Sequence, residues 1–381
     1  MKKQKICIIG DGLTGLATAL ILSKLDIEIN LIRKSKIIKK SGDNRTTAIS
    51  ESNYSFLLGY LNNTDLKAFW SCKNIDLYHE KLSQYYHFMN FSNNEKNLMH
   101  IIKNEKLKKI FLEKLKKQKN IKIINEEIKK ININDSSVLI KNKKVIFDLI
   151  ILCLGSKSKI VEKLIGKRFI NDDLKEIAFT SLVKHDSIIA EPKQYFLKEG
   201  PLAILPLNKK IFSYVWSMNE SYRSYKKDEI KNLVYSKLKN ILNSKTKIIL
   251  EEPMSFPISF KFNVNLSKKN LLVLGDGSYN VHPIAGQGFN LILRDIKKLF
   301  DFMNNHLSLG LQIKDSLFIK KFVNSRKPEN LLFGLGINFT NKFFMHNKST
   351  SLLKEIILKD LNKFEFLKKL SLKISDKGIF Q

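Results

Sequence analysis

Cysteine is scarce in this sequence, and the three cysteines, Cys7, Cys72 and Cys153, do not have the spacing of metal ligands. Cys7 and Cys153 fall in segments that we predict to be strands, where a free cysteine behaves as a small hydrophobic core residue. An odd number of cysteines without a paired pattern favours a reducing compartment. We therefore predict no metal site.

Long apolar runs are also missing. No segment approaches the roughly 18 apolar residues of a spanning helix. The apolar run after the basic residues 1–3 ends at Gly10, so we do not expect it to act as a signal peptide. The protein is expected to be cytoplasmic, with peripheral attachment at the inner face of the membrane as the alternative. There is no internal repeat.

Acidic residues are few beside basic ones, and the formal net charge is +31. Such a charge suggests nucleic-acid binding, but the lysines are spread along the whole chain and no recognised nucleic-acid motif accompanies them. We therefore interpret them as solvated surface residues and expect no nucleic-acid partner. A second use of this charge is attraction to an anionic membrane surface.

The chain has ample apolar residues for a packed interior, with 43% hydrophobic and 10% aromatic residues. Its 381 residues fit two closely associated domains and a tail. Short, alternating, aromatic-rich strands are predicted between residues 179 and 216, which indicates an antiparallel sheet inserted into the larger fold. From Leu299 onward the pattern becomes helical.

The N-terminus carries a dinucleotide-binding fingerprint. A predicted strand over residues 5–9 leads directly into Gly-Asp-Gly-Leu-Thr-Gly at 10–15, an apolar helix follows, and a second strand covers 27–32. In this motif Gly10 permits the tight turn, Gly12 lets a pyrophosphate approach the backbone, and Gly15 allows close helix–strand packing. The acid expected at the end of the second strand is absent, because Arg33 occupies that place.

A second glycine-rich segment lies near residues 271–290. An apolar strand ends at Gly275-Asp276, a loop with Pro283 follows, and a helix is predicted to begin near Gly288. Asp276 can accept hydrogen bonds from ligand hydroxyls, and the loop aims a helix N-terminus at a ligand. The alternative is an ordinary strand–loop–helix corner. Arg45, in a polar loop, is a candidate flavin or phosphate contact or else a surface residue.

Together these segments resemble one family in order and spacing. The sequence is similar to the flavin-dependent aromatic hydroxylases of ubiquinone biosynthesis, the UbiH/UbiF type, which are themselves similar to para-hydroxybenzoate hydroxylase. The resemblance runs over essentially the whole chain. The segments that carry it are residues 10–15, Asp43-Asn44-Arg45, Gly200-Pro201-Leu202-Ala203 to Leu207, 213–217, Gly275-Asp276 and His282-Pro283 to Asn290.

The resemblance implies an α/β fold, in which a Rossmann-like (GR2-type) FAD-binding domain carries an inserted antiparallel β-sheet substrate domain and a helical C-terminal region. We expect the FAD-binding domain over residues 1–73, 97–170 and 264–305, the substrate domain over 74–96 and 171–263, and the helical region over 306–381. The implied activity is hydroxylation of the aromatic ring of a polyprenylated phenol, with FAD as cofactor, molecular oxygen as co-substrate and NAD(P)H as electron donor.

Site residues are carried over position by position. The residues expected to position the flavin ring are Pro283, Gly286, Gln287 and Gly288. The cofactor-binding residues are these four with Gly10, Gly12, Leu13, Thr14, Gly15, Arg33, Arg45, Asn104, Gly155, Gly275, Asp276, Phe289 and Asn290. The residues expected to face the substrate are Pro206, Tyr214 and Trp216.

The chain departs from the family pattern at three places. Arg33 stands where the family has the ribose-binding Glu, Leu154-Gly155 replaces an Asp-Gly pair, and Gly277-Ser278-Tyr279 replaces Ala-Ala-His. These departures predict weaker binding of the adenosine side of FAD or altered coupling to the reductant. They leave two alternatives to a hydroxylase: a lipid oxidoreductase that inserts no oxygen, and a non-catalytic relative that scaffolds a quinone-biosynthesis complex. The resemblance also allows association with such a complex.

Overall fold

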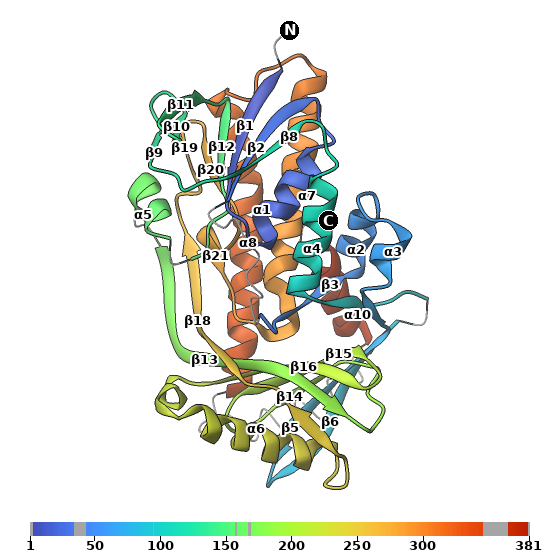
Figure 1. Cartoon of the computed structure of the whole chain (residues 1–381). Coiled ribbons are helices and arrows are strands. Elements are labelled where there is room, and N and C mark those ends of the chain that lie inside the picture. The colour runs from blue at the N-terminus through green and yellow to red at the C-terminus, as the bar shows by residue number, and fades with distance from the viewer. Residues whose placement is uncertain are drawn as a thin grey trace.

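The computed structural model describes residues 3–33, 43–93, 95–156, 158–166, 169–345 and 365–379. It has two main layers of sheet, one above the other in Figure 1. The upper layer is a mostly parallel sheet between helices and a small second sheet. The lower layer is a large, curved, mostly antiparallel sheet that is covered on its far side by the helix α6 (Lys227–Leu242).

The upper sheet has six strands, in the order β19-β20-β12-β1-β2-β8. All its neighbouring strands are parallel except β19 and β20. The buried strands are nearly continuous apolar runs, as parallel sheets covered on both faces require. Their bounds are β1 Gln4–Ile9, β2 Ile27–Arg33, β8 Ile121–Asn125, β12 Leu149–Leu152, β19 Ser267–Lys268 and β20 Leu271–Val273.

Helices cover one face of this sheet, and a small sheet covers the other. The core on the first face joins the strands to α1 (Leu13–Leu22), α4 (Asn104–Leu115) and α7 (Gln287–Ser308). On the second face, β12 and β20 pack against α5 (Lys159–Ile165) and a three-stranded sheet. That sheet has the order β11-β10-β9, with bounds Lys143–Ile146, Ser137–Ile140 and Lys130–Asn132.

The lower sheet is the nine-stranded one. Its order is β21-β18-β13-β16-β15-β14-β5-β6, and β17 pairs with β13. A buried apolar cluster fixes α6 to its outer face, so only the inner face points toward the upper layer. The bounds are β5 Asn74–Lys81, β6 Gln84–Ser92, β13 Phe169–His185, β14 Lys193–Phe196, β15 Pro201–Asn208, β16 Ile211–Asn219, β17 Ile248–Leu250, β18 Met254–Asn263 and β21 Tyr279–Asn280.

A third group of elements joins the two layers. The sheet β3-β7-β4 has the bounds Thr46–Ser50, Met99–Lys103 and Trp70–Cys72, and it packs against α2 (Glu51–Leu58). The short helix α3 covers Asn63–Leu66. The long helix α8 (Ser316–Met345) runs along both layers, and α10 (Glu365–Lys377) lies beside α2 (Figure 1). The 3-10 helices are η1 Glu220–Ser224, η2 Gly275–Gly277 and η3 Ile284–Gly286.

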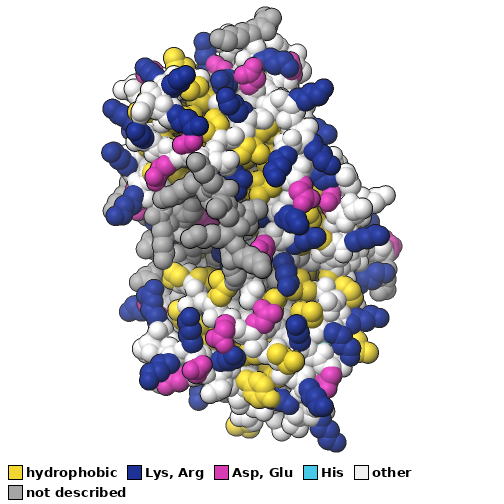
Figure 2. Space-filling view, viewed as in Figure 1, with side chains coloured by type: hydrophobic (Ala, Val, Ile, Leu, Met, Phe, Trp, Pro, Cys, Tyr) yellow, Lys and Arg dark blue, Asp and Glu magenta, His cyan; other side chains and the backbone are white. Residues whose placement is uncertain are grey.

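This architecture confirms the predicted α/β fold with an inserted antiparallel sheet and a helical C-terminal region. The expected domain boundaries stay a prediction. Residues 346–364 of the expected helical region lie outside the described residues. Figure 2 shows Lys and Arg side chains scattered over the whole visible face, as expected for solvated surface residues.

The packing of Gly15 gives a stability prediction. A Cβ atom at Gly15 would lie 2.2 Å from the backbone oxygen of Gly10, whereas one at Gly59 would meet nothing closer than 3.8 Å. We expect Gly15→Ala to lower the free energy of unfolding by about 1–3 kcal/mol, because the backbone must move to accept the methyl group. The control Gly59→Ala should be neutral or slightly stabilising. Urea denaturation measures both, and equal midpoints for the two variants would contradict this account of the turn.

Candidate functional site

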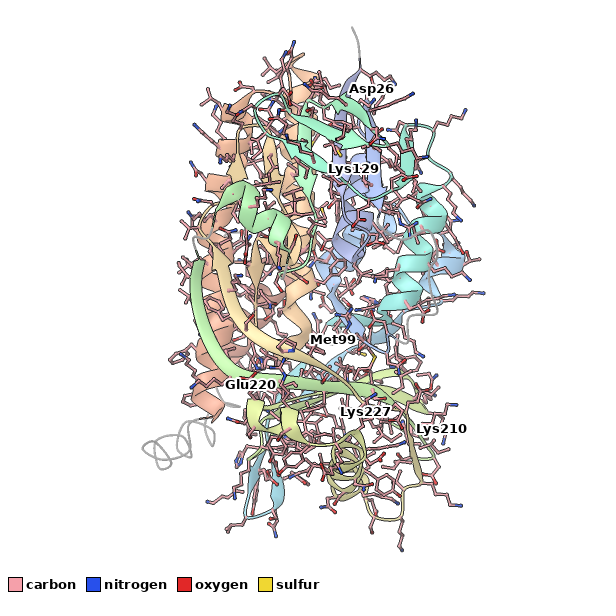
Figure 3. All side chains as sticks on the ribbon, turned by 60° about the vertical axis from the view of Figure 1, so that its left-hand side comes forward. Asp26, Met99, Lys129, Lys210, Glu220 and Lys227 are labelled. Carbon is pink, nitrogen blue, oxygen red and sulfur yellow. The ribbon has the colours of Figure 1, made fainter. Side chains whose placement is uncertain are left out.

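A cavity of about 1620 Å³ lies between the two layers. Met99, one of its lining residues, is labelled in Figure 3 at the level where the layers meet. Strand-end loops of the upper sheet form one end of the cavity, and apolar side chains of the lower sheet form much of the rest. Helices α8 and α10 supply another part of the wall.

Three loops meet at the carboxyl ends of β1, β12 and β20. A Cβ atom at Gly10, whose φ is +132°, would lie 2.2 Å from the backbone oxygen of Cys153. A Cβ atom at Gly275 would lie 2.8 Å from the side chain of Thr14. The N-terminal fingerprint and the Gly275-Asp276 segment, more than 250 residues apart in the chain, therefore touch each other.

The backbone of this junction is open to a ligand. A Cβ atom at Gly12 or Gly155 would have no neighbour within 4 Å among the described residues. Gly12 is the N-cap of α1, and no described side chain caps this end, so the first N–H groups at Leu13 and Thr14 are available to an anion. This arrangement fits a pyrophosphate. These residues lie beside the cavity described above, whereas Gly155 and Asp276 line it.

Asp276 lines the cavity, and its side chain is exposed to the cavity space. The surrounding protein raises the pKa of the Asp276 carboxyl by removing water, and the charge of Arg45 opposes this shift. Among the described residues, no side chain or backbone group donates a hydrogen bond to this carboxyl. A carboxylate in this position can therefore accept hydrogen bonds from ligand hydroxyls, as the ribityl chain of FAD offers.

Arg45 and Asn104 both line the cavity, and both also have partners in the protein. Arg45 forms a two-pronged ion pair with Asp43, with 2.8 Å between each pair of nitrogen and oxygen atoms. This pair, with Asp276 nearby, raises the pKa of the Arg45 guanidinium. Asn104 accepts a hydrogen bond from the Thr47 hydroxyl at 2.6 Å. Both side chains are thus held at the cavity edge.

The loop before α7 faces the cavity. Pro283 and Gly286 of this loop line it, as do Gln287, Gly288, Phe289 and Asn290 in the first turn of α7. Gly286 adopts a left-handed conformation with φ +62° and is the N-cap of α7, again without a capping side chain. The side-chain oxygen of Gln287 is buried and has no hydrogen-bond partner in the described part of the chain. The helix N-terminus thus offers N–H donors to a ligand that carries negative charge.

Asn290 and His282 anchor this loop. Asn290 accepts hydrogen bonds from the Ser50 amide at 2.9 Å and donates to the Ala48 oxygen at 2.9 Å. The His282 Nε2 lies 2.7 Å from a Glu176 oxygen, and Asn341 donates to the other Glu176 oxygen at 2.9 Å. The sequence did not indicate Glu176 or Asn341, since they lie far from the loop in the chain and in no motif.

The three departures from the family pattern have different structural settings. Tyr279 donates a 2.5 Å hydrogen bond to Asp295 inside a buried polar cluster, so it faces away from the cavity. Leu154 packs with the apolar residues beside β12. The Arg33 Nε is buried at the end of β2 with no hydrogen-bond partner among the described residues. Weaker binding of the adenosine side remains the prediction from these positions.

The three residues expected to face the substrate are not brought to the cavity. Tyr214 and Trp216 are fully buried in the cluster beneath α6, and Pro206 is buried without lining the cavity. Successive side chains of a strand point to opposite faces of a sheet. The residues of these two strands that line the cavity are Ala203, Leu205 and Val215, whose side chains lie on the opposite face of the sheet.

Comparisons with known proteins find similarity to an epoxidase, a monooxygenase and a hydroxylase. Residues 211–372 match the family model for squalene epoxidase. Over 186 residues the chain is 29% identical to the ubiquinone biosynthesis monooxygenase COQ6, mitochondrial, of Dictyostelium discoideum, covering 40% of this chain and 38% of that protein. Over 157 residues it is 26% identical to the 3-demethoxyubiquinol 3-hydroxylase of Escherichia coli (strain K12), covering 40% of each. The chain thus spans about two fifths of these relatives' length.

Solved structures match over nearly the whole chain. The p-nitrophenol 4-monooxygenase PnpA of Pseudomonas putida DLL-E4 has a TM-score of 0.80 at 14% identity, covering 99% of both chains. HpxO of Klebsiella pneumoniae, solved with FAD and uric acid, has a TM-score of 0.76 at 13% identity, covering 99% of this chain and 98% of that one. The fold is therefore that of FAD-dependent monooxygenases, and the resemblance to ubiquinone-biosynthesis hydroxylases is confirmed.

Asp276 yields a prediction on cofactor affinity. Loss of a charge-assisted hydrogen bond removes about 1.5–3 kcal/mol, so Asp276→Asn should weaken FAD binding by about 10- to 150-fold. Titration of the FAD-free protein, followed by flavin fluorescence, measures the dissociation constant. Asp228→Asn, an exposed acid on α6, is the control and should leave the constant unchanged. Equal affinities for the two variants would refute the assigned role.

The same variant should stabilise the FAD-free protein. Because the folded state raises the pKa of Asp276, the ionised carboxylate destabilises folding above the ordinary Asp range near about 3.9. Asp276→Asn removes that charge, so its free energy of unfolding should exceed that of the wild type at neutral pH. The difference should shrink as the pH falls and Asp276 becomes protonated. Urea denaturation at pH 7 and at pH 4 tests the sign.

Proposed function

We propose that this protein is an FAD-dependent monooxygenase that hydroxylates the aromatic ring of a polyprenylated phenol in ubiquinone biosynthesis. The single observation that supports this most is the shared cavity. Asp276 and the N-terminus of α7 open into the same space as the apolar inner face of the lower sheet. A cofactor held at one end can thus meet an apolar aromatic substrate at the other.

FAD, when bound and reduced, supplies the activated oxygen for the ring, and NAD(P)H is the electron donor in this proposal. The glycines at 10, 12 and 15 and the N-terminus of α1 hold the pyrophosphate. Asp276 binds the ribityl hydroxyls. Pro283 and residues 286–288 position the flavin ring, and the N–H groups of α7 stabilise negative charge at its edge.

Apolar side chains bind the substrate. Ala203, Leu205 and Val215 line the cavity from β15 and β16, and Leu77 and Phe88 line it from β5 and β6. The cavity volume of about 1620 Å³ exceeds the roughly 300–1,000 Å³ of an ordinary small-molecule pocket, which suits a flavin and a lipid-like phenol together. Apolar walls also keep water away from the reacting atoms.

A relative without oxygen insertion, or one without catalysis, is the second candidate, favoured by the change at Arg33, where the family has the ribose-binding Glu. Purified protein distinguishes the candidates. A scaffold would bind no FAD, and a simple oxidoreductase would release a product without an added oxygen. The hydroxylase should bind FAD and add one oxygen atom from molecular oxygen to the ring.

Deletion of the gene tests the proposed reaction in the cell. Lipid mass spectrometry should show a polyprenylated phenol that lacks one hydroxyl group, because the missing step blocks the pathway there. A wild-type copy should restore the quinone, as should Asp228→Asn, whereas Asp276→Asn should restore it poorly. An unchanged quinone profile after deletion would reject the proposed pathway.

We further propose peripheral contact with an anionic membrane, through which the substrate arrives. No helix in the described part of the chain is both long and apolar enough to span a bilayer. Phe339 on α8 lines the cavity, and 71% of this residue is nevertheless exposed. Phe343 also lines the cavity. The neighbouring residue Lys348 and the side chains of Phe344 and Met345 lie outside the described residues.

Liposome co-sedimentation tests this contact. Binding should be stronger to anionic than to neutral vesicles and should fall with salt, because the Debye length shrinks from about 10 Å at 0.1 M to about 3 Å at 1 M. Phe339→Ser should weaken binding, while Leu82→Ser, at an 88% exposed residue of the β5–β6 turn, should not. Equal binding to both vesicle types would remove the electrostatic account.

A further inference from the structure

A second polar cluster lies in the small sheet β3-β7-β4, outside the cofactor cradle. Its members are Glu51 at the start of α2, His100 on β7 and Ser71 on β4. The His100 Nε2 lies 2.7 Å from a Glu51 oxygen, and its Nδ1 lies 2.8 Å from the Ser71 hydroxyl. The imidazole thus joins a carboxylate to a hydroxyl.

The three groups lead from the molecular surface, through the buried interior, to the cavity. Ser71 is exposed on the molecular surface, His100 is 2% exposed, and Glu51 lines the cavity. The chain of hydrogen bonds therefore begins at solvent, crosses a buried histidine and ends at the cavity wall. Each group lies within hydrogen-bond distance of the next, so no water molecule is needed between them.

Packing fixes the imidazole in this position. Ser71 and His100 are directly paired residues of β4 and β7, so their side chains are neighbours by register. The ring of Tyr54 stacks on the imidazole with 3.5 Å between centroids and 12° between planes. Such a stack holds the ring plane while both nitrogens keep their partners.

The electrostatic setting favours a neutral histidine. Burial lowers the pKa of His100, and the hydrogen bond and charge of Glu51 oppose that shift. Around Glu51, the Ser55 hydroxyl donates to the carboxylate at 3.4 Å, and Asp376 of α10 accepts a hydrogen bond from the amide of the next residue, Ser52. A neutral imidazole accepts a proton at one nitrogen and donates one from the other. It is therefore suited to pass a proton on rather than to hold it.

We propose that Ser71, His100 and Glu51 form a proton path between solvent and the cavity. The proposal rests on the proposed function, in which ring hydroxylation converts one NAD(P)H, one O₂ and one proton into NAD(P)⁺, one water and one added ring oxygen. The consumed proton must cross a wall built to exclude water. Ser71 passes its proton to His100 Nδ1 and takes one from water, His100 passes its Nε2 proton to Glu51, and Glu51 releases it into the cavity.

Proton uptake during reduction of bound FAD tests the path without any hydroxylation. Two-electron photoreduction of FAD-loaded protein takes up protons, and a pH indicator in weakly buffered solution follows their arrival from bulk. His100→Gln and Glu51→Gln, which keep size and hydrogen bonding, should slow uptake by about 10²-fold, the scale of one general acid–base group. Ser71→Ala, at the exposed end, should slow it less because water can replace the hydroxyl.

Controls separate transfer from structure. His185→Gln, at another buried histidine on β13, should leave uptake at the wild-type rate. All variants should keep the wild-type FAD affinity and flavin absorbance spectrum. Imidazole added to His100→Ala should restore fast uptake in proportion to its concentration, which a merely structural role would not produce.

Two results would overturn the path, and they are distinguishable. Wild-type uptake rates in FAD-loaded His100→Gln and Glu51→Gln would reject the path while leaving the proposed function intact. Failure of the wild-type protein to bind FAD would reject the proposed function, and the path with it.

Discussion

The close packing of three loops at the carboxyl ends of β1, β12 and β20 is the constraint on which the rest of the structure depends. Gly10 contacts the backbone after β12, and Gly275 contacts the first turn of α1, in both cases without room for a side chain. Parallel strands bring their carboxyl ends to one edge, so this contact gathers three distant segments. The helices α1 and α7 then point their N-termini at neighbouring places, and Asp276 lies between them.

Local requirements explain what could be predicted from the sequence. The fingerprint at residues 10–15 and the Gly275-Asp276 segment are short stretches of consecutive residues, so both could be recognised in the sequence. The contacts that exclude a side chain at Gly10 and Gly275 come from distant segments and could not. The placement of Tyr214 and Trp216 could not be predicted, since both faces of β16 carry apolar residues and a shift of one residue exchanges them. The clusters of Glu176 with His282, and of Glu51 with His100, join residues with no shared motif, so only the folded chain reveals them.

The buried cluster around Asp295 explains why one departure from the family pattern is tolerated. Asp295 accepts the hydrogen bond of Tyr279 and forms an ion pair with Arg326 at 2.6 Å, and Asn330 donates to both of its oxygens. These contacts raise the pKa of Arg326 and tie α7, α8 and β21 together behind the cofactor loop. A tyrosine at 279 thus has a structural partner that satisfies its hydroxyl. A buried charge pair of this kind is costly to break by removing one member.

The position of α10 has a consequence for how the molecule is assembled during synthesis. This helix supplies cavity-lining residues from 368 to 377, and Asp376 joins it to Ser52 at the start of α2. The cradle at residues 10–15 is therefore made hundreds of residues before the wall that closes the cavity beside it. While the ribosome is still at work, the nascent chain has an open half-site with exposed apolar strands, which is the state most prone to aggregation. Enclosure of a ligand is thus a late event, because it requires α10 as well as the cradle.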